Sequence, residues 1–313
     1  MGVRFLVHLF HKPHCLRKDR MKTQIRNFFV TTLIFMTMFS ISCSVTSLLT
    51  SKPAIPTLSI NFPANADVGS IVDSPKDGME LVFVPAGEFL MGSDVGKEDE
   101  KPVHSVYIDS FWIDQTEVTN GMYLSCVKDG ACRKPFNTIL YDDPDFADSP
   151  VDYVTWKNAN DYCTWAGRRL PTESEWEKAA SWDDTNKTKR IYPWGDTLGC
   201  SFANIYIEGN NESGCEGYPV KVGSYPLGAS YYGAFDMAGN VVEWVADWYD
   251  ETYYQVSPNK NPKGPTQGKY HVLRGSSFIF DASNTSRQSE GFFNSWQTFY
   301  DNVGFRCAMD NSE

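Results

Sequence analysis

Short apolar stretches separated by turn residues mark the chain after residue 78. The stretch 79–92 carries two apolar runs on either side of Pro85-Ala86-Gly87, which predicts a strand, a turn and a second strand. Residues 106–109 alternate Val and Ile with Tyr and Asp, so we expect a further strand with one buried face. This part of the chain is therefore expected to form β-structure.

Two or three helices are predicted in the middle of the chain. Thr119 is a suitable N-cap for a short helix toward Cys126, and a second helix is expected over residues 155–167, ending at a glycine suited to a left-handed position. Thr172 and Glu175 have the spacing of a capping box. Beyond this third helix, short aromatic pieces lie between Gly, Pro, Asn and Asp without a helical period, which predicts much irregular backbone.

The stretch 233–249 combines an apolar, aromatic run with acids at Asp236, Glu243 and Asp247. A carboxylate inside a buried strand needs a partner, because an uncompensated buried charge is costly. Asp236 and Glu243, with main-chain carbonyls near Gly239, are hard oxygen ligands of the kind that calcium takes. A turn around Gly239, followed by a buried strand that ends in solvated acids, explains the same pattern. Spacing alone does not separate the two interpretations.

The N-terminal segment has the pattern of an export signal. Met21 opens a short positive segment, which is followed by an apolar stretch over residues 28–39 and small residues leading to Cys43. The apolar stretch is short for a membrane span, and Ser-Ile-Ser before Cys43 resembles a bacterial lipobox, in which the cysteine carries the lipid. We therefore expect residues 1–43 to be the signal segment of an exported, membrane-anchored bacterial lipoprotein on the periplasmic or cell-surface side. Ordinary cleavage and an uncleaved anchor are the alternatives.

The composition of the chain after residue 43 predicts a tether followed by one folded domain. Residues 44–77 are rich in Ser, Thr, Pro and Asp with little periodicity, which predicts a flexible tether, and the domain is expected over residues 78–310. The chain is 42% hydrophobic and 14% aromatic, enough for one large core. A net charge of -11 argues against a nucleic acid partner, because binding phosphates needs a basic surface.

Six of the eight cysteines lie in the domain, and an even number in an exported chain favours disulfides. Local spacing suggests two pairs and leaves a third: Cys126 with Cys132, Cys200 with Cys215, and Cys163 with Cys307. Free or zinc-bound thiols are the alternative. The domain has no Cys-x-x-Cys and only two histidines, so a tetrahedral zinc site is not expected.

Eight motifs follow one another along the domain: Phe83-Val-Pro-Ala-Gly-Glu-Phe-Leu-Met-Gly92, Glu117-Val-Thr-Asn120, Tyr162-Cys-Thr-Trp-Ala-Gly-Arg-Arg-Leu-Pro-Thr-Glu-Ser-Glu-Trp-Glu177, Tyr192-Pro-Trp-Gly-Asp196, Ala203-Asn204, Asp236-Met-Ala-Gly-Asn-Val-Val-Glu-Trp244, Leu273-Arg-Gly-Ser-Ser-Phe278 and Gly304-Phe-Arg-Cys307. In this order they resemble the formylglycine-generating enzyme family, also called sulfatase-modifying factors. The resemblance implies a single compact α+β domain of the C-type-lectin-like variety, low in regular secondary structure. It also implies the disulfide between Cys163 and Cys307.

The resemblance also implies calcium, because the family binds this ion at two sites. Ligands of the first site would be the side chains of Asp236 and Glu243 and the carbonyls of Gly239 and Val241. Ligands of the second site would be the side chain of Asn204, the carbonyl of Ile205, and the loop residues Glu216 and Tyr218. Asp236 stands where the animal enzymes have Asn, and Glu216 stands where an Asp is expected.

The resemblance further implies an oxidase that uses oxygen and copper to convert a cysteine of a new sulfatase to formylglycine. Two cysteines, five residues apart, hold soft Cu(I) as thiolates in that family. The matching positions in this chain are Phe280 and Thr285. Phe cannot ligate copper, and the hard hydroxyl of Thr binds Cu(I) poorly. With all six domain cysteines in disulfides no thiol would remain, so we predict that the catalytic pair is missing.

Three functions follow from these predictions. The first is a calcium-stabilised, catalytically silent module that binds a protein, peptide or glycan outside the cytoplasm, held at a membrane by a lipid anchor. Its groove would be lined by polar and aromatic residues near the missing pair: Arg274, Ser277, Arg287, Phe292, Phe293 and Trp296. For Phe278, Phe280 and Phe292 a place in the core is the simpler interpretation, and Arg274 and Arg306 are expected to fix loops through carboxylates.

The second function is the formylglycine-generating oxidase itself, with copper as a cofactor. The third is the coupling of sulfur to histidine betaine, which in this family uses an iron site on an additional helical domain. We expect no room for that domain in this chain.

Overall fold

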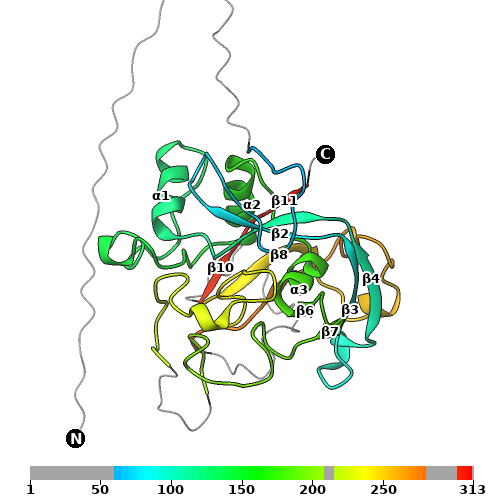
Figure 1. The fold of residues 1–313 in the computed structure, drawn as a ribbon. Helices are drawn as coiled ribbons and strands as arrows, with labels where there is room; N and C mark the ends of the chain where they lie inside the picture. Colours follow the sequence, from blue (N-terminus) through cyan, green and yellow to red (C-terminus); the bar gives the residue numbers. More distant parts are fainter. Residues whose placement is uncertain (1–59, 208–214, 280–301, 312–313) are drawn as a thin grey trace, which may run out of the picture. The chain divides into compact units, whose positions relative to one another are not determined.

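A four-stranded antiparallel sheet joins both ends of the domain in the computed structural model. Its strand order is β1-β2-β5-β11, with bounds Ile71–Asp73, Glu80–Val84, Phe111–Asp114 and Ala308–Asp310. The structure describes residues 60–207, 215–279 and 302–311, which belong to one compact unit. Because the last strand pairs with β5, the C-terminal part of the domain lies beside its first strands (Figure 1).

The other strands in the described part of the chain form three smaller sheets. In the sheet that positions the site, β8 (Val242–Trp248) pairs in parallel with β10 (Val303–Phe305) and antiparallel with β9 (His271–Arg274). The two remaining sheets are the pairs β3 (Gly87–Met91) with β4 (His104–Ile108), and β6 (Trp182–Asp183) with β7 (Thr188–Lys189). The described residues also form four short 3-10 helices: η1 (Glu98–Glu100), η2 (Pro144–Phe146), η3 (Pro226–Gly228) and η4 (Tyr253–Gln255).

The three predicted helices are confirmed. They are α1 (Asn120–Lys128), α2 (Trp156–Trp165) and α3 (Glu173–Ser181). Each begins after a threonine whose side chain accepts a backbone N–H bond of the first turn, and α2 and α3 have complete capping boxes. Gly167, just after α2, has φ +77°, which is the left-handed position expected there.

Helix α3 is the centre of the core, and all nine of its residues are buried. Trp176 and Ala180 pack in one cluster with Val82 of β2, Val106 of β4 and Val245 of β8. A second cluster lies around α2, where Tyr162 contacts Tyr123 of α1 and Phe305 of β10. In Figure 1, α3 lies between β8 and the pair β3 and β4, with which it is in contact. The domain mixes helices with mostly antiparallel strands and has little regular secondary structure, as predicted.

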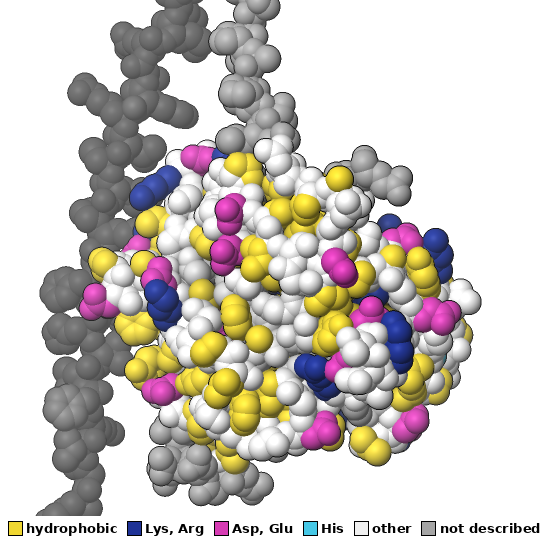
Figure 2. All heavy atoms as spheres, in the orientation of Figure 1, with side chains coloured by type: hydrophobic (Ala, Val, Ile, Leu, Met, Phe, Trp, Pro, Cys, Tyr) yellow, Lys and Arg dark blue, Asp and Glu magenta, His cyan; other side chains and the backbone are white. Residues whose placement is uncertain are grey.

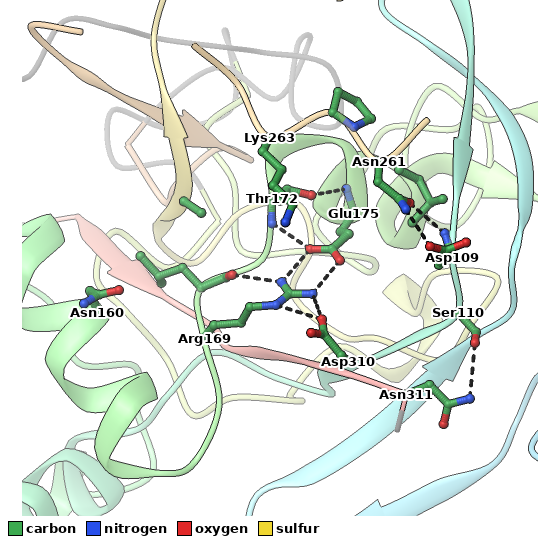
Figure 3. A pocket seen from close by; sticks show the side chains of 14 residues that line it. Asp109, Ser110, Asn160, Arg169, Thr172, Glu175, Asn261, Lys263, Asp310 and Asn311 are labelled. Atoms are coloured by element: carbon green, nitrogen blue, oxygen red, sulfur yellow. Dashed lines mark hydrogen bonds and ion pairs between the residues drawn. The ribbon is translucent and has the colours of Figure 1, made fainter. Parts of the chain in front are cut away.

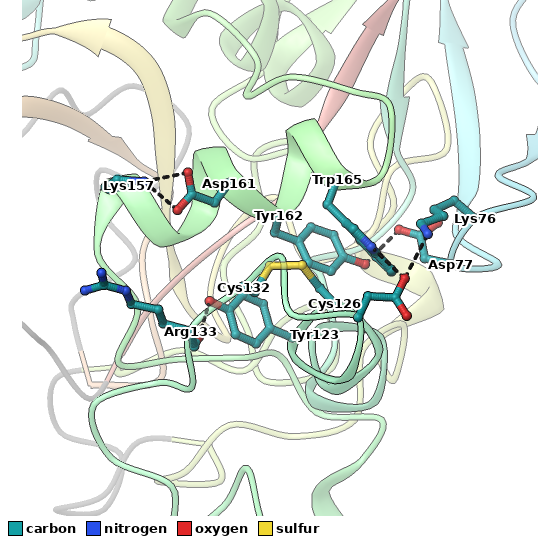
Figure 4. Close-up of a disulfide and its surroundings, with 11 residues drawn as sticks. Lys76, Asp77, Tyr123, Cys126, Cys132, Arg133, Lys157, Asp161, Tyr162 and Trp165 are labelled. Atoms are coloured by element: carbon teal, nitrogen blue, oxygen red, sulfur yellow. Dashed lines mark hydrogen bonds and ion pairs between the residues drawn. A yellow bond between two sulfur atoms is a disulfide. The ribbon is translucent and has the colours of Figure 1, made fainter. Parts of the chain in front are cut away.

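All three predicted disulfides are present, so the alternative of free or zinc-bound thiols in the domain is wrong. Cys126–Cys132 closes the end of α1 beside Tyr123 and Tyr162 (Figure 4). The other two are Cys200–Cys215 and Cys163–Cys307. Cys163–Cys307 ties α2 to the last strands across 144 residues of sequence.

The predicted boundary between tether and domain at residue 78 lies too late. Val72 of β1 pairs with Leu81 of β2, and Ile60, Phe62 and Ala66 pack against the cluster around Trp112. Folded structure therefore begins by residue 60. A three-residue strand with two exposed side chains leaves no periodic pattern in the sequence.

The signal segment and Cys43 lie outside the described residues. Within the described ranges, no helix has the length and hydropathy needed to cross a membrane. On the face in Figure 2, acidic and basic side chains are interspersed, with hydrophobic side chains among them.

Candidate functional site

The acidic stretch begins with a tight turn that leads into β8. Asp236 and Asn240 have φ +56° and +59°, and Gly239 between them has φ +91°. A side chain at Gly239 would collide with the Asn204 carbonyl, because a Cβ there would lie 2.4 Å from its oxygen. The turn and the buried strand β8 that follows agree with the simpler of the two interpretations, except that Asp247 is buried rather than solvated.

Glu243 and Arg306 form a fully buried ion pair at the start of β8. Arg306 donates from Nε to Oε2 of Glu243 at 2.8 Å and from Nη2 to Oε1 at 2.7 Å. Trp176 of α3 donates its indole N–H to Oε2 at 2.8 Å. Arg306 also donates to the carbonyls of Asp114, Gln115 and Phe235. As expected, this arginine fixes loops through a carboxylate.

Two further buried acids lie close to this pair. Oδ2 of Asp236 accepts a hydrogen bond from the Gly223 N–H at 2.6 Å, and burial raises the pKa of Asp236 to about 6. Burial and the nearby charge of Asp236 raise the pKa of Glu117 well above its usual value. Three carboxylates here face one guanidinium, so the cluster favours a proton or a cation.

Some predicted ligands of the first calcium site already form hydrogen bonds with other residues of the protein. Both oxygens of Glu243 accept hydrogen bonds from Arg306, although Oε1 accepts only one. Asp236, Gly239 and Val241 lie on the turn that leads into β8. No group of three or more His, Cys, Asp or Glu side chains in the described part of the chain is arranged to hold a metal. A cation at this site would therefore depend on carbonyl oxygens.

The predicted ligands of the second site fit calcium better. Oδ1 of Asn204 is buried and has no partner among the described residues, while its Nδ2 donates to the Tyr218 carbonyl at 2.9 Å. The Ile205 carbonyl accepts from the Cys215 N–H at 2.9 Å, so the disulfide loop brings these residues together. The Glu216 side chain is exposed. An unpartnered amide oxygen beside carbonyls is a donor set of the type that calcium uses.

A cavity of about 550 Å³ lies on another part of the domain, between α2, β11 and the loop around residue 262 (Figure 3). Its polar lining includes Asn160, Arg169, Glu175, Lys263 and Asp310. The sequence did not indicate this site, because its residues come from segments far apart in the chain; Asn311, for example, donates a hydrogen bond to Ser110 across 201 positions.

One known protein family matches nearly the whole domain. The family described as "Sulfatase-modifying factor enzyme 1-like domain" matches residues 68–311 of this chain. The chain belongs to this sulfatase-modifying factor family. The formylglycine-generating enzyme of Streptomyces coelicolor is 32% identical over 305 residues, covering 79% of this chain and 95% of that protein.

Other proteins similar to this chain carry different names. The serine/threonine-protein kinase pkn1 of Chlamydia caviae is 36% identical over 253 residues, which cover 73% of this chain. The match spans only 38% of the kinase. The structure of PvdO from Pseudomonas aeruginosa has a TM-score of 0.64 at 23% identity and covers 79% of this chain and 100% of that one, which shows the shared fold.

The family's copper positions lie outside the described residues. This applies to Phe280 and Thr285 and to the predicted groove residues Arg287, Phe292, Phe293 and Trp296. At the described edge, Asn302 donates to the buried Ser277 hydroxyl at 2.9 Å, and Phe278 is buried as expected for a core residue. Arg274 forms ion pairs with Glu177 at 2.7 Å and Glu173 at 3.3 Å, as expected for a structural arginine.

Proposed function

We propose that this chain is an extracytoplasmic sulfatase-modifying factor homologue that binds a ligand and lacks the family's oxidase chemistry. The supporting observation is the use of its cysteines. All six in the domain form disulfides, and the other two, Cys15 and Cys43, precede the domain. Phe280 and Thr285 stand at the copper positions. Cu(I) prefers thiolates, and the domain retains none.

Three disulfides in one domain support a location outside the cytoplasm, since such bonds persist in oxidising compartments. We place the lipid anchor on Cys43 and calcium at the Asn204 site. In this proposal calcium has a structural role. Its ligands would hold the loop that contains Cys200–Cys215 against the turn before β8.

A formylglycine-generating oxidase is the second candidate, favoured by the 32% identity to the Streptomyces coelicolor enzyme. It would require copper ligands other than a cysteine pair. No particular set of described residues supports such a site.

Peptide turnover separates the two candidates. The full chain is incubated with Cu(I), oxygen and a peptide containing Cys-x-Pro-x-Arg, and the product is analysed by mass spectrometry. The Streptomyces coelicolor enzyme serves as the positive control. We expect unmodified cysteine in the presence of this chain, and catalytic formation of formylglycine would overturn the proposal.

A further inference from the structure

The cavity in Figure 3 has a size and lining suited to a small ligand. Its volume of about 550 Å³ lies within the usual range of small-molecule sites. Aliphatic groups of Ile108, Leu170 and Pro262 form part of its wall. Polar groups approach from α2, from β11 and from the loop after β8.

Arg169 lines this cavity, but all its N–H groups already donate hydrogen bonds within the protein. Its Nη1 and Nη2 donate to the two carboxylate oxygens of Glu175, both at 2.7 Å. Its Nε and Nη2 donate to Oδ1 of Asp310, and Nη1 also donates to the Leu170 carbonyl. All five N–H groups are used, so Arg169 holds Glu175 and Asp310 in place.

Three other groups remain available for a ligand. Among the described residues, the ammonium of Lys263 and the amide of Asn160 have no partner. Asp310 uses only Oδ1 in its bonds to Arg169, and its side chain is 81% exposed. The free groups are therefore one cation, one carboxylate oxygen and one amide, placed around the cavity on different elements (Figure 3).

We infer that this cavity binds a zwitterion: a free α-amino acid or a short peptide with both ends free. Lys263 would bind the carboxylate, Asp310 the ammonium group, and Asn160 a peptide or carboxyl group. This inference rests on the proposed role of the chain as a binding module and names its ligand class.

Charge complementarity selects this class over the other ligands expected from the sequence. A neutral glycan would cover the unpaired ammonium of Lys263 without supplying a charge to it, and desolvating an unpaired charge is unfavourable. A ligand with a single charge would pair with one group and be repelled by the other. A zwitterion pairs with both, and the amide of Asn160 can donate to and accept from a peptide group.

Ligand-observed NMR and calorimetry on the full chain test the inference. The probes are the common α-amino acids, alanine and leucine dipeptides, the same dipeptides with an acetylated N-terminus or an amidated C-terminus, and maltose as a neutral glycan. We expect saturable binding of at least one free zwitterion. Blocking either end should weaken binding about tenfold, because each end forms a charge-assisted hydrogen bond.

Three variants locate the site. Lys263→Met removes the cation while keeping the aliphatic chain, and Asn160→Ala removes the amide. Each should raise the Kd of the bound zwitterion about tenfold. Lys269→Met is the matched control, since Lys269 follows in the same loop, lies over Tyr270 and does not line the cavity.

Absence of binding by every amino acid and dipeptide would overturn the inference, as would binding that Lys263→Met leaves unchanged or a preference for maltose. None of these results affects the peptide-turnover assay. Conversely, formylglycine formation would refute the proposed function even if a dipeptide bound in this cavity.

Discussion

Removing the disulfides one pair at a time should destabilise the domain in an order set by loop length. The three pairs close loops with sequence separations of 144, 15 and 6 residues. A crosslink restricts the unfolded chain more when it closes a longer loop. The chain-entropy relation gives about 5 kcal/mol for Cys163–Cys307, about 3 for Cys200–Cys215 and about 2 for Cys126–Cys132.

The comparison between the longest and the shortest loop is the most informative. Cys126, Cys163 and Cys307 are fully buried and Cys132 nearly so. Replacing either pair by alanines therefore removes the same atoms from similar surroundings. The cost of lost packing should then be similar, and a difference of about 3 kcal/mol should remain from loop closure.

Urea unfolding monitored by tryptophan fluorescence gives the free energy of unfolding for each double variant. The m-value should also rise most for the variant without Cys163–Cys307, because its unfolded state exposes more surface. Equal losses in the two variants, or a larger loss for Cys126–Cys132, would refute the loop-length reasoning. Native-state packing would then be the dominant contribution.

Three further results are expected. Saturating calcium should raise the Tm by about 5–10 °C, since a ligand that binds only the folded state stabilises it. Asn204→Ala should abolish the response, whereas the control Asn186→Ala should keep it, because the Asn186 amide bonds to Asp183 and is not a predicted calcium ligand. A Tm indifferent to calcium and EDTA would count against the site. Burial raises the pKa of Glu173 to about 7 from 4.5. Its contribution to stability is therefore present below pH 4.5 and is lost as the pH rises through 7, so wild type should lose up to about 3 kcal/mol relative to Glu173→Gln over this range; parallel urea-derived profiles would show that Glu173 does not titrate there. Cys43→Ala should abolish palmitate labelling and move the protein out of the membrane fraction, and unchanged fractionation would exclude this anchor.

Local signals in the sequence predicted local structure well. The capping threonines and the left-handed Gly167 were predictable, because each depends on side chains within four residues of a helix end. The disulfides followed from cysteine spacing. The motifs identified the family because they extend along nearly the whole domain.

Contacts between distant segments were not predictable in the same way. Asp247 was expected in solvent under the simpler interpretation, yet its Oδ2 accepts a hydrogen bond of 2.8 Å from the Glu173 N–H. The Asp247 carboxylate therefore lies at the N-terminus of α3, where the helix dipole favours a negative charge. Asp247 and Glu173 are 74 positions apart in the sequence. The cavity around Lys263 was missed for the same reason, whereas β1 was missed because a three-residue strand leaves no periodic pattern in the sequence.

Copper(I) stoichiometry tests most directly whether the domain lacks a thiolate pair. The full chain carrying Cys15→Ala and Cys43→Ala is purified without reductant, titrated with Cu(I) against a competing chelator and analysed for bound metal. We expect no retained copper, because every remaining cysteine is in a disulfide. One tightly bound Cu(I) per chain would contradict this expectation and restore the oxidase as the better assignment.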